Sequence, residues 1–206
     1  MSNVLNLVID AAVCAGKKIL QIYNSDFDVN YKKDNSPLTL ADKEAHSIIL
    51  SYLEKTDYPI LSEEGKDIPF KIRKTWDKFW LVDPLDGTKE FIKRNGEFTV
   101  NIALIKKNKP IIGVIYVPVY DTLYYGSDSS AFKVLNYSSD NSIKHKLPVK
   151  FKKKKFTIVG SRSHMSKETK LFFEKKQKEI GDIEVLAVGS SLKLCMVAEG
   201  KADAYP

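Results

Sequence analysis

The chain has 206 residues, of which 43% are hydrophobic and 29% charged, and this composition excludes a disordered or collagen-like protein. Its length suits one large domain or two small lobes that share a core. No apolar run approaches the roughly 20 residues that a membrane-spanning helix needs, and Asn3, Asn6 and Asp10 interrupt the apolar start. We therefore expect neither a membrane span nor a secretion signal. Cys14 and Cys195 lack CxxC spacing, which favours a reducing compartment over a disulfide framework or a zinc ribbon.

The formal net charge of +7 is concentrated in one segment, residues 144–155, which contains seven lysines and no acidic residue. The remainder of the chain is therefore neutral. A basic strip attracts any polyanion, but a site for single-stranded nucleic acid also needs aromatic side chains for base stacking, and only Phe151 and Phe156 are available. We interpret the segment as a solvated strand or loop protected by its lysines, and we expect no nucleic-acid partner.

Two amphipathic helices are predicted near the start of the chain. Between residues 4 and 23, apolar side chains recur every three or four positions, as in a helix with one buried face. After a polar stretch, Thr39 and Asp42 have the spacing of a capping box, in which each side chain bonds to the backbone of the other residue. They precede a second helical pattern that runs to Leu53.

The middle of the chain is predicted to form strands. Short apolar runs at residues 58–62 and 79–82 are typical of buried strands, and acidic residues follow both. Three further β-rich segments, at residues 98–105, 111–117 and 122–125, are separated by turn-like sequences. This order predicts an antiparallel meander.

Strands and helices alternate in the last part of the chain. The predicted elements are a strand at residues 156–159, a helix at 166–180, a strand at 183–188 and a helix from about 190 to 199. We therefore expect a layered α/β fold, with an α+β lobe at residues 1–145 and the start of an α/β lobe at residues 146–206. The two lobes would form one domain with a cleft between them.

Two acidic clusters follow the two predicted buried strands. Glu63 and Glu64 come directly after the first strand, and Asp83 and Asp86 come after the second. These carboxylates would repel one another in a cleft unless a cation neutralised them, and oxygen ligands without His or Cys favour Mg²⁺ over Zn²⁺. The alternative is that DPLDG is an ordinary β-turn with Asx capping and that both glutamates are surface charges.

The turn after the second strand is predicted to bring a metal and a phosphate together. Pro84 is expected to end the pairing of the strand, and Gly87 permits a ligand to approach the backbone closely. A helix that starts at Thr88 would direct its first N–H groups at an anion, most naturally a phosphate. His46 and His164 have no partner at ligand spacing, so we assign them no metal.

The sequence DPLDGT at residues 83–88, preceded by the acidic pair at 63–64, resembles the lithium-sensitive, magnesium-dependent phosphatase superfamily that includes inositol monophosphatase and fructose-1,6-bisphosphatase. Longer segments resemble one branch of it, the bacterial CysQ-type 3′(2′),5′-bisphosphate nucleotidases. These segments are residues 34–42, 61–64, 80–105, 113–119, 161–164 and 189–206. The resemblance spans the chain and implies the inositol monophosphatase or sugar phosphatase fold.

The resemblance also implies roles for particular residues. At the positions that match the family's magnesium ligands stand Glu63, Asp83, Asp86 and, through its carbonyl, Leu85. Asp42 and Thr88 match the pair that activates the attacking water. The resemblance also implies a catalytic role for Glu63. The implied substrate-binding set consists of Glu63, Leu85, Asp86, Gly87, Thr88, Gly189, Ser190, Ser191 and Lys193.

The implied reaction is hydrolysis of the 3′-phosphate of adenosine 3′,5′-bisphosphate to AMP and phosphate with two or three Mg²⁺ ions, in the cytoplasm or at the periphery of the inner membrane. An inositol-phosphate or sugar-phosphate phosphatase would share every metal ligand. A catalytically inactive phosphonucleotide-binding or RNA-associating protein is an alternative of a different class. In the family the sequence continues beyond the equivalent of Pro206 to a Trp-Asp motif with another metal ligand. We therefore expect a fold that is incomplete at its C-terminus and weak or no activity in this chain.

Overall fold

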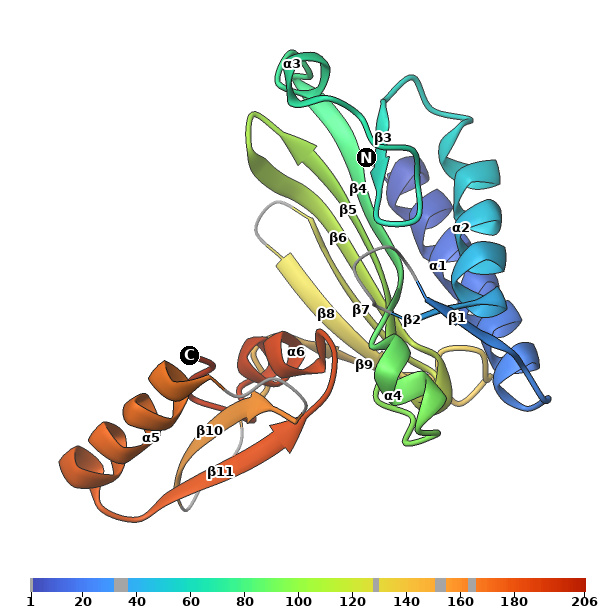
Figure 1. The fold of residues 1–206 in the computed structure, drawn as a ribbon. Coiled ribbons are helices and arrows are strands. Elements are labelled where there is room, and N and C mark those ends of the chain that lie inside the picture. Colours follow the sequence, from blue (N-terminus) through green and yellow to red (C-terminus); the bar gives the residue numbers. More distant parts are fainter. Residues whose placement is uncertain (1, 32–36, 128–129, 151–154, 163–165) are drawn as a thin grey trace.

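The computed structural model describes residues 2–31, 37–127, 130–150, 155–162 and 166–206 (Figure 1). Its helices are α1 (Ser2–Tyr23), α2 (Leu40–Leu53), α3 (Phe70–Arg73), α4 (Thr88–Ile92), α5 (Lys167–Ile180) and α6 (Leu192–Glu199), with a 3₁₀ turn at Pro118–Tyr120. Its strands are β1 (Val29–Tyr31), β2 (Pro37–Thr39), β3 (Ile60–Ser62), β4 (Lys78–Asp86), β5 (Thr99–Lys106), β6 (Lys109–Val117), β7 (Thr122–Ser127), β8 (Ser130–Leu135), β9 (Ile143–Lys146), β10 (Phe156–Ser161) and β11 (Ile183–Val188).

The main sheet has seven strands in the order β3-β4-β5-β6-β7-β8-β9. β3 and β4 pair in parallel, and each later pair is antiparallel, so the expected meander is confirmed. It continues into β8 and β9, which were not predicted from the sequence. β10 and β11 form a separate parallel pair connected through α5. These layers confirm the predicted α/β class.

One face of the main sheet is covered by α1 and α2 (Figure 1). Three alternate residues of β5, Val100, Ile102 and Leu104, lie in this core and are at most 3% exposed. A Cβ atom at Gly16 of α1 would lie 2.4 Å from the Tyr116 ring, so this helix position must be a glycine for the helix to approach the sheet. Burial on one stripe of each helix and on alternate strand residues explains why apolar spacing predicted these layers.

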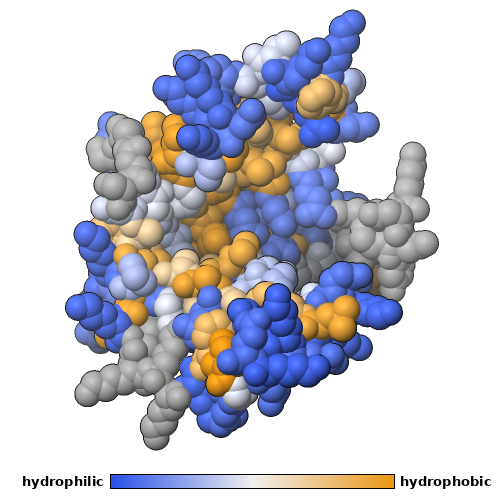
Figure 2. Space-filling model, turned by 90° about the vertical axis from the view of Figure 1, so that its left-hand side faces the viewer, coloured by the Kyte–Doolittle hydropathy of each residue, from blue (hydrophilic) through white to orange (hydrophobic). Residues whose placement is uncertain are grey.

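The opposite face of the main sheet is apolar and partly open. Leu81 of β4 is 45% exposed there, whereas its neighbour Trp80 on the covered face is fully buried. Leu194 of α6 lines the same hollow and is 56% exposed. Figure 2 shows apolar side chains gathered in a hollow on this side of the molecule.

The prediction that the second buried strand ends at Val82 was wrong. β4 does not stop at Val82 but continues to Asp86, and its pairing with β5 shifts register between Asp83 and Asp86. Pairing resumes where Asp86 lies opposite Thr99. Pro84 is tolerated because it lies in this irregular stretch, where no N–H group is needed for the ladder. The two aspartates therefore flank a bulge within one strand.

Thr39 is the N-cap of α2, and the predicted capping box is confirmed. Thr39 Oγ1 accepts a hydrogen bond from the Ala41 N–H at 3.2 Å. Asp42 Oδ2 accepts two hydrogen bonds from Thr39, one from the backbone N–H and one from the hydroxyl, both at 2.7 Å. These bonds fix Asp42, which is only 1% exposed.

The basic segment begins in β9, the last strand in the order of the main sheet, which confirms a lysine-bearing edge strand for its first residues. The Lys144 ammonium group lies 4.2 Å from the centre of the Phe132 ring, so part of this charge covers an aromatic surface. Residues 151–154 and His164 lie outside the described residues. Over the described ranges, no helix is long and apolar enough to cross a membrane.

A buried ion pair anchors the C-terminal end of α6 to the main sheet. The Glu199 carboxylate is 2% exposed and is bonded by the Lys133 ammonium group of β8. The Tyr124 hydroxyl of β7 also lies within 3.4 Å of this carboxylate. Because both charges are largely buried and paired, the pair holds α6 in one place over β7 and β8.

Candidate active site

Asp42 and Thr88, the two residues expected to activate water, are in contact. Thr88 is the first residue of α4, and its Oγ1 donates a hydrogen bond to Asp42 Oδ1 at 3.1 Å. The capping box occupies the other oxygen, Oδ2. Burial raises the pKa of Asp42, and the nearby Glu64 charge raises it further, while the hydrogen bonds from Thr39 and Thr88 oppose the rise.

Asp83 lies beside two other carboxylates, those of Glu63 and Asp86. Burial raises the pKa of Asp83 to about 8, and the charges of Asp86 and Glu63 contribute to the same rise. Asp83 Oδ1 is buried and has no hydrogen-bond partner among the described residues. A buried carboxylate oxygen without a partner, next to two further carboxylates, is the arrangement that a hard cation would complete.

The donors of this cluster fit Mg²⁺ in their chemistry. All are oxygens, from three carboxylates and a backbone carbonyl, without His or Cys. Among the residues that the structure describes, no group of three or more acidic, His or Cys side chains is already arranged so that it could hold a metal ion. Glu63 is exposed at the end of β3, whereas Asp83 is half-buried, so the cluster faces solvent on the Glu63 side.

The residues before α6 reach the same cluster. The Ser191 N–H donates to Asp86 Oδ2 at 2.5 Å, and Ser191 Oγ donates to Asn101 Oδ1 at 2.9 Å. Burial raises the pKa of Asp86, and the hydrogen bond from Ser191 and the charge of Lys193 oppose this rise. Burial lowers the pKa of Lys193, and the Asp86 charge acts in the opposite direction. Ser191 and Lys193 therefore lie beside the acidic cluster.

Two glycines allow backbone segments to meet at this site. Gly87 has a φ of +95°, and a Cβ atom there would lie 2.9 Å from the Glu97 carbonyl oxygen and 3.1 Å from the Ser190 Cβ. A Cβ atom at Gly189 would lie 2.7 Å from Cγ of Glu90. The start of α4 and the segment before α6 can thus approach each other only because both positions lack a side chain.

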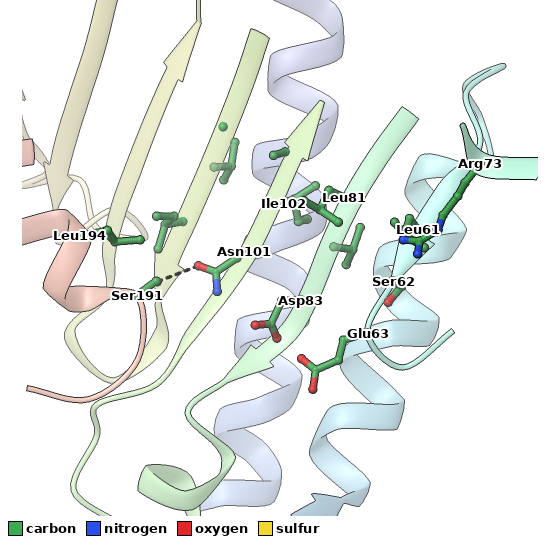
Figure 3. Close-up of a pocket in the computed structure, with 15 residues that line it drawn as sticks. Leu61, Ser62, Glu63, Arg73, Leu81, Asp83, Asn101, Ile102, Ser191 and Leu194 are labelled. Atoms are coloured by element: carbon green, nitrogen blue, oxygen red, sulfur yellow. Dashed lines mark hydrogen bonds between the residues drawn. The ribbon is translucent and has the colours of Figure 1, made fainter. Parts of the chain in front are cut away.

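A cavity of about 660 Å³ opens beside these carboxylates on the open face of the main sheet (Figure 3). Figure 3 shows Glu63 and Asp83 close together, with Asn101 and Ser191 nearby. The other side chains that line the cavity are mainly apolar and include Leu81 of β4. The cavity therefore joins an apolar wall to an acidic end, and an anionic ligand would need a cation between itself and these carboxylates.

The model of the inositol monophosphatase family matches residues 1–206. The chain belongs to this family. It is 44% identical, over 98% of its length and 79% of the relative, to the 3′(2′),5′-bisphosphate nucleotidase CysQ of Escherichia coli strain K12. It is 42% identical, over 99% of its length and 75% of the relative, to the protein of the same name from Buchnera aphidicola subsp. Acyrthosiphon pisum.

Solved structures of the inositol monophosphatase family have the same fold. The crystal structure of CysQ from Bacteroides thetaiotaomicron superimposes with a TM-score of 0.88 at 46% identity, covering 100% of this chain and 79% of that one. The suhB protein of Bartonella henselae superimposes with a TM-score of 0.78 at 26% identity, covering 98% and 77%. These matches confirm the fold that the resemblance implied.

Two residues that form hydrogen bonds at this site, Asn101 and Glu97, were not predicted from the sequence. Asn101 of β5 accepts the Ser191 hydroxyl hydrogen bond at 2.9 Å, and the Glu97 carboxylate accepts one from the Gly189 N–H at 2.7 Å. Both residues lie in the segment 80–105 that carries the resemblance. A polar residue in or before a strand gives no local signal that a distant segment will meet it, so only the fold identifies these two.

Proposed function

We propose that this protein is a 3′(2′),5′-bisphosphate nucleotidase that hydrolyses the 3′-phosphate of adenosine 3′,5′-bisphosphate to AMP and phosphate. The observation that carries the proposal is the buried, unpartnered Asp83 oxygen beside Glu63 and Asp86, next to the hydrogen-bonded pair of Thr88 and Asp42. Identities of 42–44% over 98–99% of the chain to proteins with this activity in their names support the choice of substrate.

In this proposal, Glu63, Asp83, Asp86 and the carbonyl of Leu85 hold Mg²⁺. Magnesium bound there would neutralise the clustered carboxylates, offset the charge of the phosphate and make a water molecule more acidic. Asp83 has the central position in the set, because its pKa responds to both other carboxylates and its Oδ1 has no described protein partner. Thr88 Oγ1 is also within hydrogen-bonding distance, 3.3 Å, of Leu85 O, which supports a role for both residues at one site.

Thr88 and Asp42 would activate the attacking water. When Thr88 Oγ1 donates its proton to Asp42 Oδ1, its lone pairs are available to accept a hydrogen bond from water. Asp42 cannot rotate away, because Thr39 holds its other oxygen with two hydrogen bonds. The proton lost by the water would then pass to Thr88 Oγ1 as the Thr88 proton passes to Asp42.

The substrate would bind between α4 and α6. The N–H groups of Gly87 and Thr88 would hold the phosphate that is removed, and Lys193 would lie on the nucleotide side of the pocket. Gly189, Ser190 and Ser191 would line the nucleotide side of the pocket, since they lie against the start of α4. We further propose that residues 1–145 and 146–206 are two lobes of one catalytic domain that acts in the cytoplasm.

A comparison of substrates tests this function. Purified protein is incubated with Mg²⁺ and either adenosine 3′,5′-bisphosphate or inositol 1-phosphate, and phosphate release is measured. We expect the bisphosphate to be hydrolysed with the higher kcat/KM, at the low overall rate that the sequence led us to expect. Preference for inositol 1-phosphate would replace this proposal by an inositol phosphatase. Tight binding of the bisphosphate without release of phosphate would instead indicate a nucleotide-binding protein.

A further inference from the structure

Glu97, between α4 and β5, holds together segments that are far apart in the sequence. Its carboxylate accepts hydrogen bonds from Arg162 Nε at 3.0 Å and from Arg162 Nη2 at 2.7 Å. The same carboxylate accepts a third hydrogen bond, from the Gly189 N–H at 2.7 Å. The Glu97 side chain is only 17% exposed, so it is more fixed than the carboxylate of an ordinary surface ion pair.

Arg162 braces this carboxylate from the second sheet. It directs two nitrogens at Glu97 in a fork, and Nη2 also donates to the Ala187 carbonyl of β11 at 2.6 Å. A fork of this kind fixes the direction of a carboxylate as well as its position. Glu97 therefore presents one oxygen to Gly189 in a direction that the β10–β11 sheet determines.

The segment that Glu97 holds is the one that contacts Asp86. Two residues after Gly189, the Ser191 N–H donates to Asp86 Oδ2 at 2.5 Å. Between them, Ser190 has a φ of +49°, a left-handed conformation that is uncommon for residues other than glycine. Such a conformation persists only where surrounding contacts impose it. The hydrogen bond from Gly189 to Glu97 is one contact at the start of this turn, and the bond from Ser191 to Asp86 is one contact at its end. Between them, the Lys193 ammonium group donates to the Ser190 carbonyl at 2.5 Å.

We propose that Glu97, braced by Arg162, is a positioning residue that sets the conformation of residues 189–191 and, through Ser191, the orientation of the Asp86 carboxylate. Glu97 does not touch the cavity that carries the acidic cluster, so its effect is transmitted by the 189–191 segment. This inference rests on the proposed function only where kcat and KM for the bisphosphate are measured. Its other consequences concern the free protein and Mg²⁺ alone.

The test uses Glu97→Gln, which keeps the side-chain shape but removes the charge that orients Arg162, and Arg162→Gln, which removes the brace and leaves Glu97 in place. Glu179→Gln is the matched control, because Glu179 forms ion pairs with Lys175 and Lys176 within α5 rather than with the residues of the site. The readouts are the backbone amide NMR shifts of Gly189 and Ser191, calorimetric binding of Mg²⁺ without substrate, and kcat and KM for the bisphosphate.

We expect both site variants to shift the Gly189 and Ser191 amide signals and to weaken Mg²⁺ binding by about tenfold, as is typical when a residue that orients a metal ligand is lost. We expect kcat to fall more than KM rises, and Glu179→Gln to change none of these. Because the two residues act as one unit, the double variant should be little worse than either single variant.

Unchanged amide signals and Mg²⁺ binding in both variants, with only a lower melting temperature, would reduce the Glu97–Arg162 pair to a structural ion pair and overturn the proposal. If Glu97→Gln does not fold, Arg162→Gln decides alone, since Arg162 is partly exposed at the end of β10. Absence of bisphosphate hydrolysis by the wild type would overturn the proposed function but leave the amide and Mg²⁺ comparisons valid.

Discussion

Thr88 Oγ1 donates a hydrogen bond to Asp42 Oδ1 at 3.1 Å, across 46 residues of sequence. This contact joins the N-terminus of α4 to the N-terminus of α2. It depends on the capping box, because Thr39 holds the second oxygen of the same carboxylate with two bonds of 2.7 Å. One aspartate therefore both starts a helix and orients the hydroxyl that we expect to receive a proton from water.

Thr88→Ala should lower kcat by about 10²- to 10⁴-fold, the usual contribution of a proton-transfer step, with a much smaller change in KM or in Mg²⁺ affinity. The reason is that the hydroxyl orients and deprotonates water and contributes little to binding of the ground state. Thr88→Ser retains the hydroxyl and is the control, for which most activity should remain. Steady-state kinetics with the bisphosphate measures both. A Thr88→Ala enzyme within a few-fold of the wild type would remove this pair from the mechanism.

Asp83→Asn should abolish Mg²⁺-dependent phosphate release, because a neutral amide cannot compensate the charge of bound cations. The same change should stabilise the metal-free protein at pH 8, because it removes a buried charge that Glu63 and Asp86 repel. Activity and melting temperature in EDTA are the two measurements. Loss of activity together with a lower melting temperature would instead mean that the substitution damages the fold.

Stability of the metal-free protein should also depend on pH through Asp83. Its pKa is raised from 3.8 to about 8 in the folded protein, so the fold favours the neutral carboxyl. The resulting stabilisation is fully present below pH 3.8 and is lost as the pH rises through about 8. We expect the melting temperature in EDTA to fall over this range, relative to Asp83→Asn as reference. Added Mg²⁺ should reduce the fall. Parallel pH profiles for both proteins would contradict this account.

Gly87→Ala should destabilise the protein by about 1–3 kcal/mol, because the residue has a φ of +95° and a Cβ atom would meet the Glu97 carbonyl oxygen at 2.9 Å. Gly113→Ala is the matched control, since a Cβ atom there meets nothing within 4 Å. Urea denaturation gives both free energies of unfolding. Equal stability of the two variants would show that the start of α4 relaxes to accept a side chain.

The basic segment 144–155 should be dispensable for hydrolysis. Its first residues form a sheet edge, and Lys144 covers the ring of Phe132 rather than projecting into the site. Replacing Lys146, Lys150 and Lys155 with Gln should therefore leave kcat/KM nearly unchanged at moderate salt. Filter binding of single-stranded RNA over a salt series is the second measurement. Tight, salt-dependent RNA binding that these substitutions abolish would favour a nucleic-acid-associating protein.

Local patterns in the sequence were sufficient to predict every helix except α3, most of the strands, the capping box at Thr39 and the acidic residues after β3 and within β4. These features depend on the spacing of apolar residues and on contacts between residues a few positions apart, which a single sequence displays directly. The bulge in β4 was not predicted, since Pro84 usually ends the pairing of a strand and only the opposing β5 allows it to resume.

Only the tertiary structure decided which distant residues meet at the site. The contacts of Ser191 with Asp86 and of Glu97 with Arg162 and Gly189 depend on how the β10–β11 layer packs against the end of the main sheet. No periodicity in the sequence encodes such a contact, because neither partner differs locally from other polar residues. The contact forms only when the packing of the layers brings the two residues together and excludes water around them.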